Sequence, residues 1–147
     1  MKGYTLIELL IVVGVLAILT GLSALSMVSF SKSSDIETSA TIVKGALSEA
    51  RAGSMADIDD KTWGVYLEPN RAILFADSGS GYNPSDPSNS VRIISNQTSL
   101  SWGLAGGGNI IEFSKRTGKT AEGGTITCSG ESVNTKTLNI NSEGLIE

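Results

Sequence analysis

The chain has 147 residues, a formal net charge of −4 and a sequence pI near 4.8. This length provides one compact domain with a short appendage, and the acidic balance argues against a broad basic surface for nucleic acid. Histidine is absent and Cys128 is the single cysteine, which excludes an intrachain disulfide, the usual zinc sites and a Ser–His or Cys–His catalytic pair. Because the carboxylates are scattered, we expect neither an enzyme nor a cofactor.

The first predicted element is a long apolar helix. From Leu9 to Phe30 the chain carries no charged residue, and as a helix this run is about 33 Å long, enough to cross a hydrocarbon core of ~30 Å. A transmembrane anchor therefore fits the run. A cleavable secretory signal with Leu9–Leu19 as its apolar region is an alternative. A buried core helix fits less well, because the run is too long and too uniform.

The residues before this run separate the first two interpretations. Glu8 directly precedes the apolar stretch, whereas the head of a secretory signal is basic. A carboxylate there is costly in a membrane and calls for a function and a partner. Thr5 and Glu8 also have the spacing of a capping box at a helix start, where the helix dipole favours negative charge. Lys2 predicts a cytoplasmic N-terminus, with the rest of the chain outside.

The segment Gly3-Tyr4-Thr5-Leu6-Ile7-Glu8-Leu9-Leu10, followed by the apolar helix, closely resembles the prepilin segment of type IV pilins, type II secretion pseudopilins and competence pseudopilins. The resemblance implies cleavage by prepilin peptidase between Gly3 and Tyr4, methylation of the new amine of Tyr4, and subunit docking through Glu8. The chain departs from the family in two places. Tyr4 stands where the family usually has Phe, and Leu25 stands where it often has a helix-kinking Pro.

The helix is predicted to continue beyond the apolar run. A stripe with helical spacing consists of Ile36, Ala40, Val43, Leu47 and Ala50. The stripe predicts an amphipathic helix that reaches about Ala52, covers a sheet and ends at Gly53. Arg51 lies off the stripe and is expected to be solvated. The alternative is a separate surface helix joined through a serine-rich hinge at Ser31–Ser34.

The rest of the chain is predicted to be β-rich. Strands are expected at Thr62–Leu67, Arg71–Ala76, Val91–Ile94, Leu100–Leu104, Asn109–Ser114, Thr125–Ser129 and Thr137–Asn141. Glu68-Pro69-Asn70 indicates a hairpin turn, and Gly106–Gly108 a flexible break. The order predicts an α+β fold with a long N-terminal membrane-spanning and amphipathic helix packed on an antiparallel β-sheet or small β-sandwich head. The expected segments are a leader (1–3), a transmembrane assembly helix (4–30), its amphipathic continuation (31–56) and a β-rich head (57–147).

The second half also resembles a subset of this family. The residues that carry the resemblance are Ala46-Leu47-x-x-Ala50-Arg51, Trp63-Gly64, Phe113, Gly118 and Gly144. Together they are similar to the H-type minor pseudopilins of type II secretion and to related minor pilins. This resemblance implies a small β-sandwich-like head. Without this resemblance, the sequence predicts only that Trp63 and Phe113 are aromatic residues of the core.

Four other features of the sequence could indicate a binding or catalytic site. The oxygen-rich loop Asp77–Asp86 does not match an EF-hand, so a mobile surface loop is expected rather than a calcium site. Asp57–Asp60 is expected to be an acidic turn that ends the helix. The basic cluster Lys115–Lys119 is small and the tail Glu143–Glu147 is acidic, which argues against DNA binding. Cys128 is predicted to be a small buried apolar residue.

The sequence therefore predicts a structural subunit, expected to be minor, of a type IV pilus or type II secretion pseudopilus. Its expected location is the cytoplasmic (inner) membrane with the head outside the cytoplasm, and the fibre after assembly. Its expected partners are other pilin or pseudopilin subunits, prepilin peptidase/methyltransferase, the assembly platform and membrane lipid. The alternatives are a major or competence pilin, and an unprocessed single-pass membrane-anchored binding domain.

Overall fold

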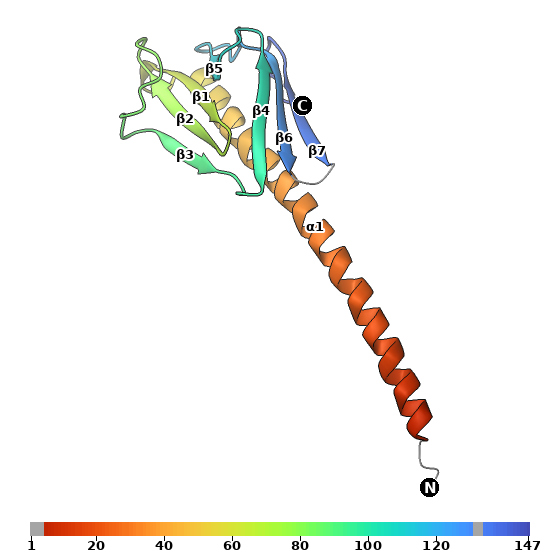
Figure 1. The fold of residues 1–147 in the computed structure, drawn as a ribbon. Helices are drawn as coiled ribbons and strands as arrows, with labels where there is room; N and C mark the ends of the chain where they lie inside the picture. Colours follow the sequence, from red (N-terminus) through yellow and green to blue (C-terminus); the bar gives the residue numbers. More distant parts are fainter. Residues whose placement is uncertain (1–4, 131–133) are drawn as a thin grey trace.

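The structure, a computed structural model, describes residues 5–130 and 134–147, and the side chains of these except 22–32. It consists of one long helix, α1 (Leu6–Met55), whose C-terminal half lies against a β-rich head while its N-terminal half extends away from it (Figure 1). The helix is continuous over 50 residues. The alternative of two helices joined by a hinge at residues 31–34 is therefore wrong.

The start of α1 follows from local capping. Thr5 precedes the helix in an extended conformation, and its hydroxyl accepts a hydrogen bond from the backbone N–H of Glu8 at 3.4 Å. This bond satisfies one of the N–H groups that a helix start leaves without a partner. The capping prediction for Thr5 is thus confirmed.

The end of α1 differs from the prediction. Gly53 does not end the helix, which runs on to Met55. A Cβ atom on Gly53 would lie 2.8 Å from the indole ring of Trp63, so glycine is needed here for close packing. The chain then turns through Asp57, whose φ of 54° is left-handed, into the short 3-10 helix η1 (Ile58–Asp60). The acidic residues thus form the predicted turn, two residues later than the glycine suggested.

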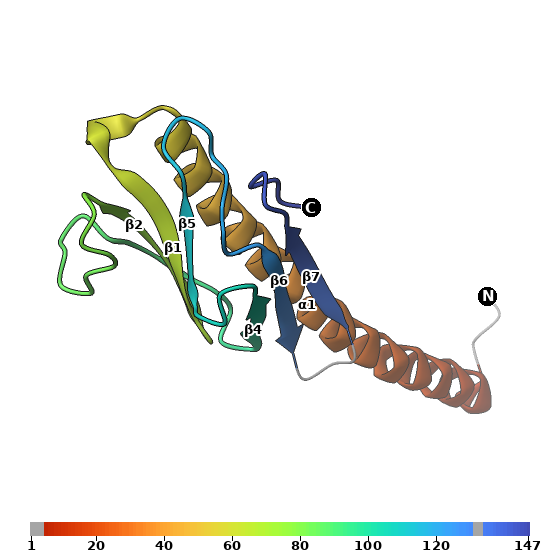
Figure 2. The same cartoon turned by 90° about the horizontal axis from the view of Figure 1, so that it is seen from above.

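Two antiparallel sheets make up the head. The strands are β1 (Thr62–Glu68), β2 (Arg71–Asp77), β3 (Ser90–Ile93), β4 (Thr98–Leu104), β5 (Ile110–Phe113), β6 (Gly124–Gly130) and β7 (Thr135–Ile140). One sheet, sheet A, has the order β3-β2-β1-β5, and the other, sheet B, has the order β4-β6-β7. Figures 1 and 2 show α1 running along both sheets. The α+β prediction and all seven strands are confirmed.

The predicted hairpin joins β1 and β2. Glu68 pairs with Arg71 in the register, which leaves Pro69 and Asn70 as the turn. The Arg71 guanidinium donates two hydrogen bonds to the Glu68 carboxylate, at 2.7 and 3.1 Å. This arrangement raises the pKa of Arg71 and fixes the register at the turn.

The core lies between the helix and the two sheets. Every residue of the predicted stripe is at most 4% exposed, as the expectation of a covered sheet requires. The stripe packs against Val65, Leu67, Ile111, Phe113 and Ile126. Trp63 is half-buried against this core, and Cys128 is fully buried. Burial raises the pKa of the Cys128 thiol to about 11, which keeps it protonated at neutral pH.

The N-terminal part of α1 extends away from the head (Figure 1), and its described side chains from Leu6 to residue 21 are exposed. Within the part of the chain described, no helical stretch is long and apolar enough to cross a membrane. The predicted transmembrane helix, residues 4–30, includes Tyr4 and the side chains of 22–30, which lie outside the described residues.

Candidate functional site

The predicted processing site, Gly3 and Tyr4, lies outside the described residues. The predicted assembly residue, Glu8, lies in the first turn of α1 and is exposed. Its negative charge stands at the positive end of the helix dipole, which stabilises it there. Among the described residues, no cationic side chain forms an ion pair with Glu8.

The helix surface around Glu8 is apolar on every side. The large exposed side chains of this segment are Leu6, Ile7, Leu9, Leu10, Ile11, Val12, Val13, Val15, Leu16, Ile18 and Leu19, each between 50% and 82% exposed. The hydroxyl of Thr20 donates to the carbonyls of Leu16 and Ala17, at 2.8 and 3.0 Å, so it needs no outside partner. A helix that is apolar all round is stable only when lipid or protein covers it.

This setting makes Glu8 an unusual residue. When lipid or neighbouring helices cover the segment, its carboxylate loses water, and an unpaired buried charge is strongly penalised. A cation brought to the carboxylate removes the penalty. The segment can thus select a partner that carries a positive charge at the right height along the helix.

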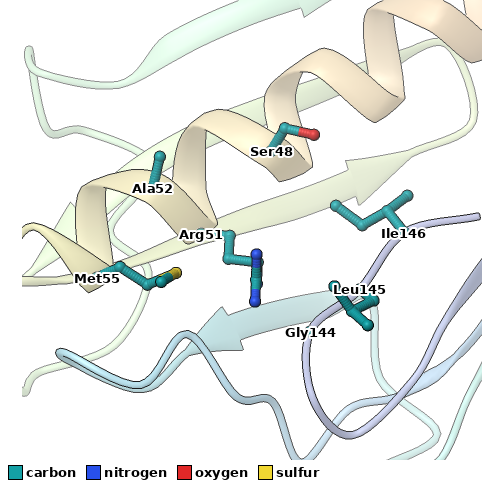
Figure 3. A pocket seen from close by; sticks show the side chains of 7 residues that line it. All are labelled: Ser48, Arg51, Ala52, Met55, Gly144, Leu145 and Ile146. Carbon is teal, nitrogen blue, oxygen red and sulfur yellow. The ribbon is translucent and has the colours of Figure 1, made fainter.

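The head has a second junction around Arg51, where the structure differs from the prediction. Arg51 was expected to be solvated, but its Nε donates to the carbonyl of Gly118 at 3.3 Å and its Nη2 to that of Glu143 at 3.4 Å. Figure 3 shows its side chain pointing from α1 toward the turn at Gly144. Arg51 is not solvated because two turns that are distant in sequence pack onto the end of the helix.

These two turns need glycine. Gly118 and Gly144 have φ of 64° and 72°, a left-handed conformation that other residues rarely adopt. A Cβ on Gly144 would also lie 2.0 Å from the carbonyl oxygen of Gly118, and a Cβ on Gly118 would lie 2.7 Å from Met55. Three residues of the H-type resemblance, Arg51, Gly118 and Gly144, therefore meet in space. Their separate positions in the sequence did not reveal this.

A shallow cavity lies beside this junction (Figure 3). Its volume is about 270 Å³, and it is lined by Ser48, Arg51, Ala52, Met55, Gly144, Leu145 and Ile146. Leu145 and Met55 are 48% and 44% exposed. The lining is mostly apolar and carries no group for catalysis.

The loop after β2 is held by hydrogen bonds to Asp77 and by a stacking contact with β1. The Asp77 carboxylate accepts hydrogen bonds from the backbone N–H groups of Gly79, Ser80 and Gly81 and from the Ser80 hydroxyl. Desolvation acts to raise the pKa of Asp77, but these bonds outweigh it and lower the pKa to about 2. Tyr82 stacks on Tyr66 with ring centroids 4.2 Å apart. Within the described residues, no group of three acidic, His or Cys side chains is placed to hold a metal.

The basic cluster forms ion pairs with acidic neighbours. Lys115 bonds to the carboxylate and the backbone carbonyl of Asp60, and it lowers the pKa of that carboxyl. Arg116 pairs with Asp57 at 2.8 Å, and Lys119 with Glu143 at 2.9 Å. Each cation is thus matched by a carboxylate from the acidic turn or the tail, and this face has no net basic character for nucleic acid.

Comparison with known proteins identifies the N-terminal segment. Residues 1–24 match the family described as the prokaryotic N-terminal methylation motif. No curated protein and no solved structure gives a significant match. The chain therefore carries the prepilin-type motif of cleavage and methylation, together with a pilin-like α+β fold.

The motif and the fold are consistent with the type IV pilin and pseudopilin family, whose members are structural and non-enzymatic. The motif also implies an inner-membrane prepilin that is processed by prepilin peptidase and assembles with other pilins into a fibre.

Proposed function

We propose that this protein is a minor subunit of a type IV pilus or of a type II secretion pseudopilus. Prepilin peptidase cleaves it between Gly3 and Tyr4, the new amine of Tyr4 is methylated, and Glu8 docks the subunit into the fibre. One observation carries the proposal: a helix segment that is apolar all round has a single carboxylate at its start and directly follows the processing motif.

Cleavage supplies the cation that Glu8 lacks. The new amine of Tyr4 is positively charged, since methylation keeps it basic, and in the sequence it directly precedes Thr5, the N-cap residue of α1. In a bundle of such helices the amine of one subunit can pair with Glu8 of its neighbour, which offsets the cost of covering the carboxylate. The pair then favours one register of the two helices, as buried polar groups do in coiled coils.

Before assembly, lipid covers the same segment. The apolar run from Leu9 to Phe30 has the length for a bilayer, and Lys2 favours a cytoplasmic N-terminus. The head then lies outside the cytoplasm. We propose that the unassembled subunit is located in the inner membrane.

The minor role rests on the H-type resemblance and on the Arg51 junction where three of its residues meet. The alternative within the class is a major or competence pilin. The yield of the processed N-terminal peptide relative to other pilins in sheared fibres separates the two, because a major subunit gives the largest yield.

The substitution Gly3→Ile tests processing, because a β-branched side chain at the cut blocks close approach to the backbone. We expect the variant to stay at full length in the membrane and to be absent from fibres, as intact mass and fractionation will show. Gly45→Ala is the control, since open space surrounds Gly45. Normal cleavage of the Gly3→Ile variant would contradict the proposed site. An unprocessed native protein in the membrane alone would identify an anchored binding domain instead.

A further inference from the structure

The turn between β3 and β4 contains the sequence Asn96-Gln97-Thr98. An asparagine two residues before a serine or threonine, with any residue except proline between them, is the acceptor pattern of N-linked glycosylation. In the whole sequence Asn96 alone meets this pattern. Asn83 has the same spacing to Ser85, but Pro84 stands between them. The chain thus offers one candidate acceptor and one natural control.

Asn96 is well placed to carry a large group. The backbone N–H of Thr98 donates to the carbonyl of Ser95 at 3.0 Å, which closes a four-residue turn that includes Asn96. The side chain of Asn96 is exposed and forms no hydrogen bond with another described residue. Its amide can therefore be modified without breaking a contact of the head.

Thr98 has a hydroxyl that the folded head does not use. It is the first residue of β4, lies opposite Gly130 and is 5% exposed. The buried hydroxyl has no hydrogen-bond partner in the part of the chain that the structure describes. Such a hydroxyl lowers stability, and valine would fill nearly the same volume without that cost. Folding therefore does not account for the hydroxyl, whereas the acceptor pattern requires it.

A groove without charged side chains adjoins this turn. Its volume is about 340 Å³, and its lining consists of Asn96, Gln97, Thr98, Ser99, Ser129 and Gly130. Hydroxyl and amide side chains both donate and accept hydrogen bonds, as the hydroxyls of a sugar require. The groove therefore gives room and hydrogen-bond partners to a sugar attached at Asn96.

The turn lies at the base of the head, where α1 leaves it (Figure 1). The backbone N–H of Ser95 donates to the hydroxyl of Ser39 on α1 at 3.3 Å. Ser39 follows Phe30, the end of the apolar run, by nine residues, which is about 14 Å along a helix. When lipid covers the apolar run, the turn is thus close to the membrane surface, where a lipid-linked sugar donor is located.

We propose that Asn96 is N-glycosylated outside the cytoplasm. The amide nitrogen of Asn96 forms a bond to the anomeric carbon of a lipid-linked oligosaccharide. The bond from that carbon to the lipid phosphate breaks, and the amide nitrogen loses one proton. Since Thr98 is buried in the folded head, the transferase binds the turn before β4 folds. The inference rests on the proposed function, which places the head outside the cytoplasm.

The test is mass spectrometry of the full-length protein from the native cell. Trypsin cuts after Arg71, Arg92 and Lys115, so residues 72–92, with Asn83, and residues 93–115, with Asn96, form separate peptides. We expect the mass of an oligosaccharide on Asn96 and none on Asn83. An unmodified Asn96 contradicts the inference, and so does a sugar that is attached to a serine or threonine of the peptide instead.

Substitutions at Thr98 separate the acceptor role from a role in folding. Thr98→Val removes the hydroxyl and should abolish the glycopeptide, whereas Thr98→Ser keeps a hydroxyl and should retain it. Asn96→Gln is the reference, because it also lacks the glycan. We expect Thr98→Val to unfold at the same temperature as Asn96→Gln or a higher one, since it leaves no buried hydroxyl without a partner. Tryptophan fluorescence on heating measures this. A surviving glycopeptide in Thr98→Val, or a lower unfolding temperature, contradicts the inference.

The N-terminal peptide of the same sample separates this inference from the proposed function. A processed N-terminus in fibres together with an unmodified Asn96 refutes the glycan and leaves the subunit role. A glycosylated Asn96 on an unprocessed membrane protein refutes the subunit role and leaves the glycan.

Discussion

The two halves of α1 differ in what covers them. From Leu6 to Leu19 the large apolar side chains are at least 50% exposed, whereas from Ile36 to Ala50 the stripe is at most 4% exposed. Burial of apolar surface contributes about 25 cal/mol per Å², so the second half stabilises the head within one chain. The first half can contribute only through lipid or another chain. One helix thus joins a surface that stabilises the head to an exposed apolar surface, which is the proposed assembly surface.

The largest expected effect is at the assembly surface. Glu8→Ala removes the carboxylate that we propose selects a cationic partner, so we expect fibres without detectable protein while membrane insertion and the fold of the head are unchanged. Fractionation of sheared fibres and membranes measures this. Glu49→Ala is the control, because Glu49 forms only an exposed ion pair with Arg92. Normal assembly of the Glu8→Ala variant would refute the docking role.

The next effect sharpens the contrast between the two halves. Leu47→Ala removes a fully buried side chain and should lower the free energy of unfolding of the head by about 2–5 kcal/mol. Leu16→Ala, at a position that is 56% exposed, should leave it unchanged. The chain has two tryptophans, Trp63 and Trp102, both in the head, so fluorescence in a denaturant series follows the head alone. Equal losses in the free energy of unfolding for the two variants would mean that both halves of α1 stabilise the head.

A glycine pair on the buried half tests close packing. Gly53→Ala places a Cβ 2.8 Å from the Trp63 ring and should destabilise the head by about 1–3 kcal/mol. Gly45→Ala meets open space on the same helix and should stabilise it by about 1 kcal/mol, the difference in helix propensity. Thermal unfolding distinguishes the two signs. Stabilisation by Gly53→Ala would contradict the close packing of the Trp63 ring on Gly53.

A smaller loss is expected at the junction between helix and tail. Arg51→Met removes hydrogen bonds to the carbonyls of Gly118 and Glu143 and should cost about 1–2 kcal/mol. Lys44→Met, which removes a cation without an ion pair among the described residues, is the matched control and should cost almost nothing. Equal losses would show that Arg51 is solvated, as its sequence position suggested.

The smallest effect concerns acid stability. The folded-state pKa of Asp77 is about 2, below its ordinary value of 3.8, so its contribution is complete above about pH 4 and declines as the pH falls toward 2. The variant Asp77→Asn should therefore show a flatter loss of stability across this range in acid titrations followed by fluorescence. If the wild type and the variant lose stability in parallel, the hydrogen bonds of Asp77 do not favour its charged form.

The sequence predicted those features that depend on local periodicity. The stripe from Ile36 to Ala50 and the alternating strands specify helix and sheet directly, and Thr5 specifies the helix start. The sequence analysis was wrong for features that depend on contacts between distant residues. Gly53 was interpreted as a helix end because the ring of Trp63 over it belongs to another element, and Arg51 as solvated because the turns at Gly118 and Gly144 reach it only in the folded chain.

The sequence left open whether the strands form one sheet or a two-sheet sandwich, because strand spacing does not determine which strands pair across a connection. For the proposed assembly site, the sequence contributed more than the structure. Gly3, Tyr4 and Glu8 follow from a specific motif, while the structure supplies what the motif cannot, namely that the helix around Glu8 is exposed on every side.

The most direct test of the account is mass spectrometry of the N-terminal peptide from sheared surface fibres and from the membrane fraction of the native cell. The account predicts that the fibre peptide begins with N-methylated Tyr4. If only intact Met1-Lys2-Gly3 is found, and in the membrane alone, the subunit role is wrong and the head is an anchored domain.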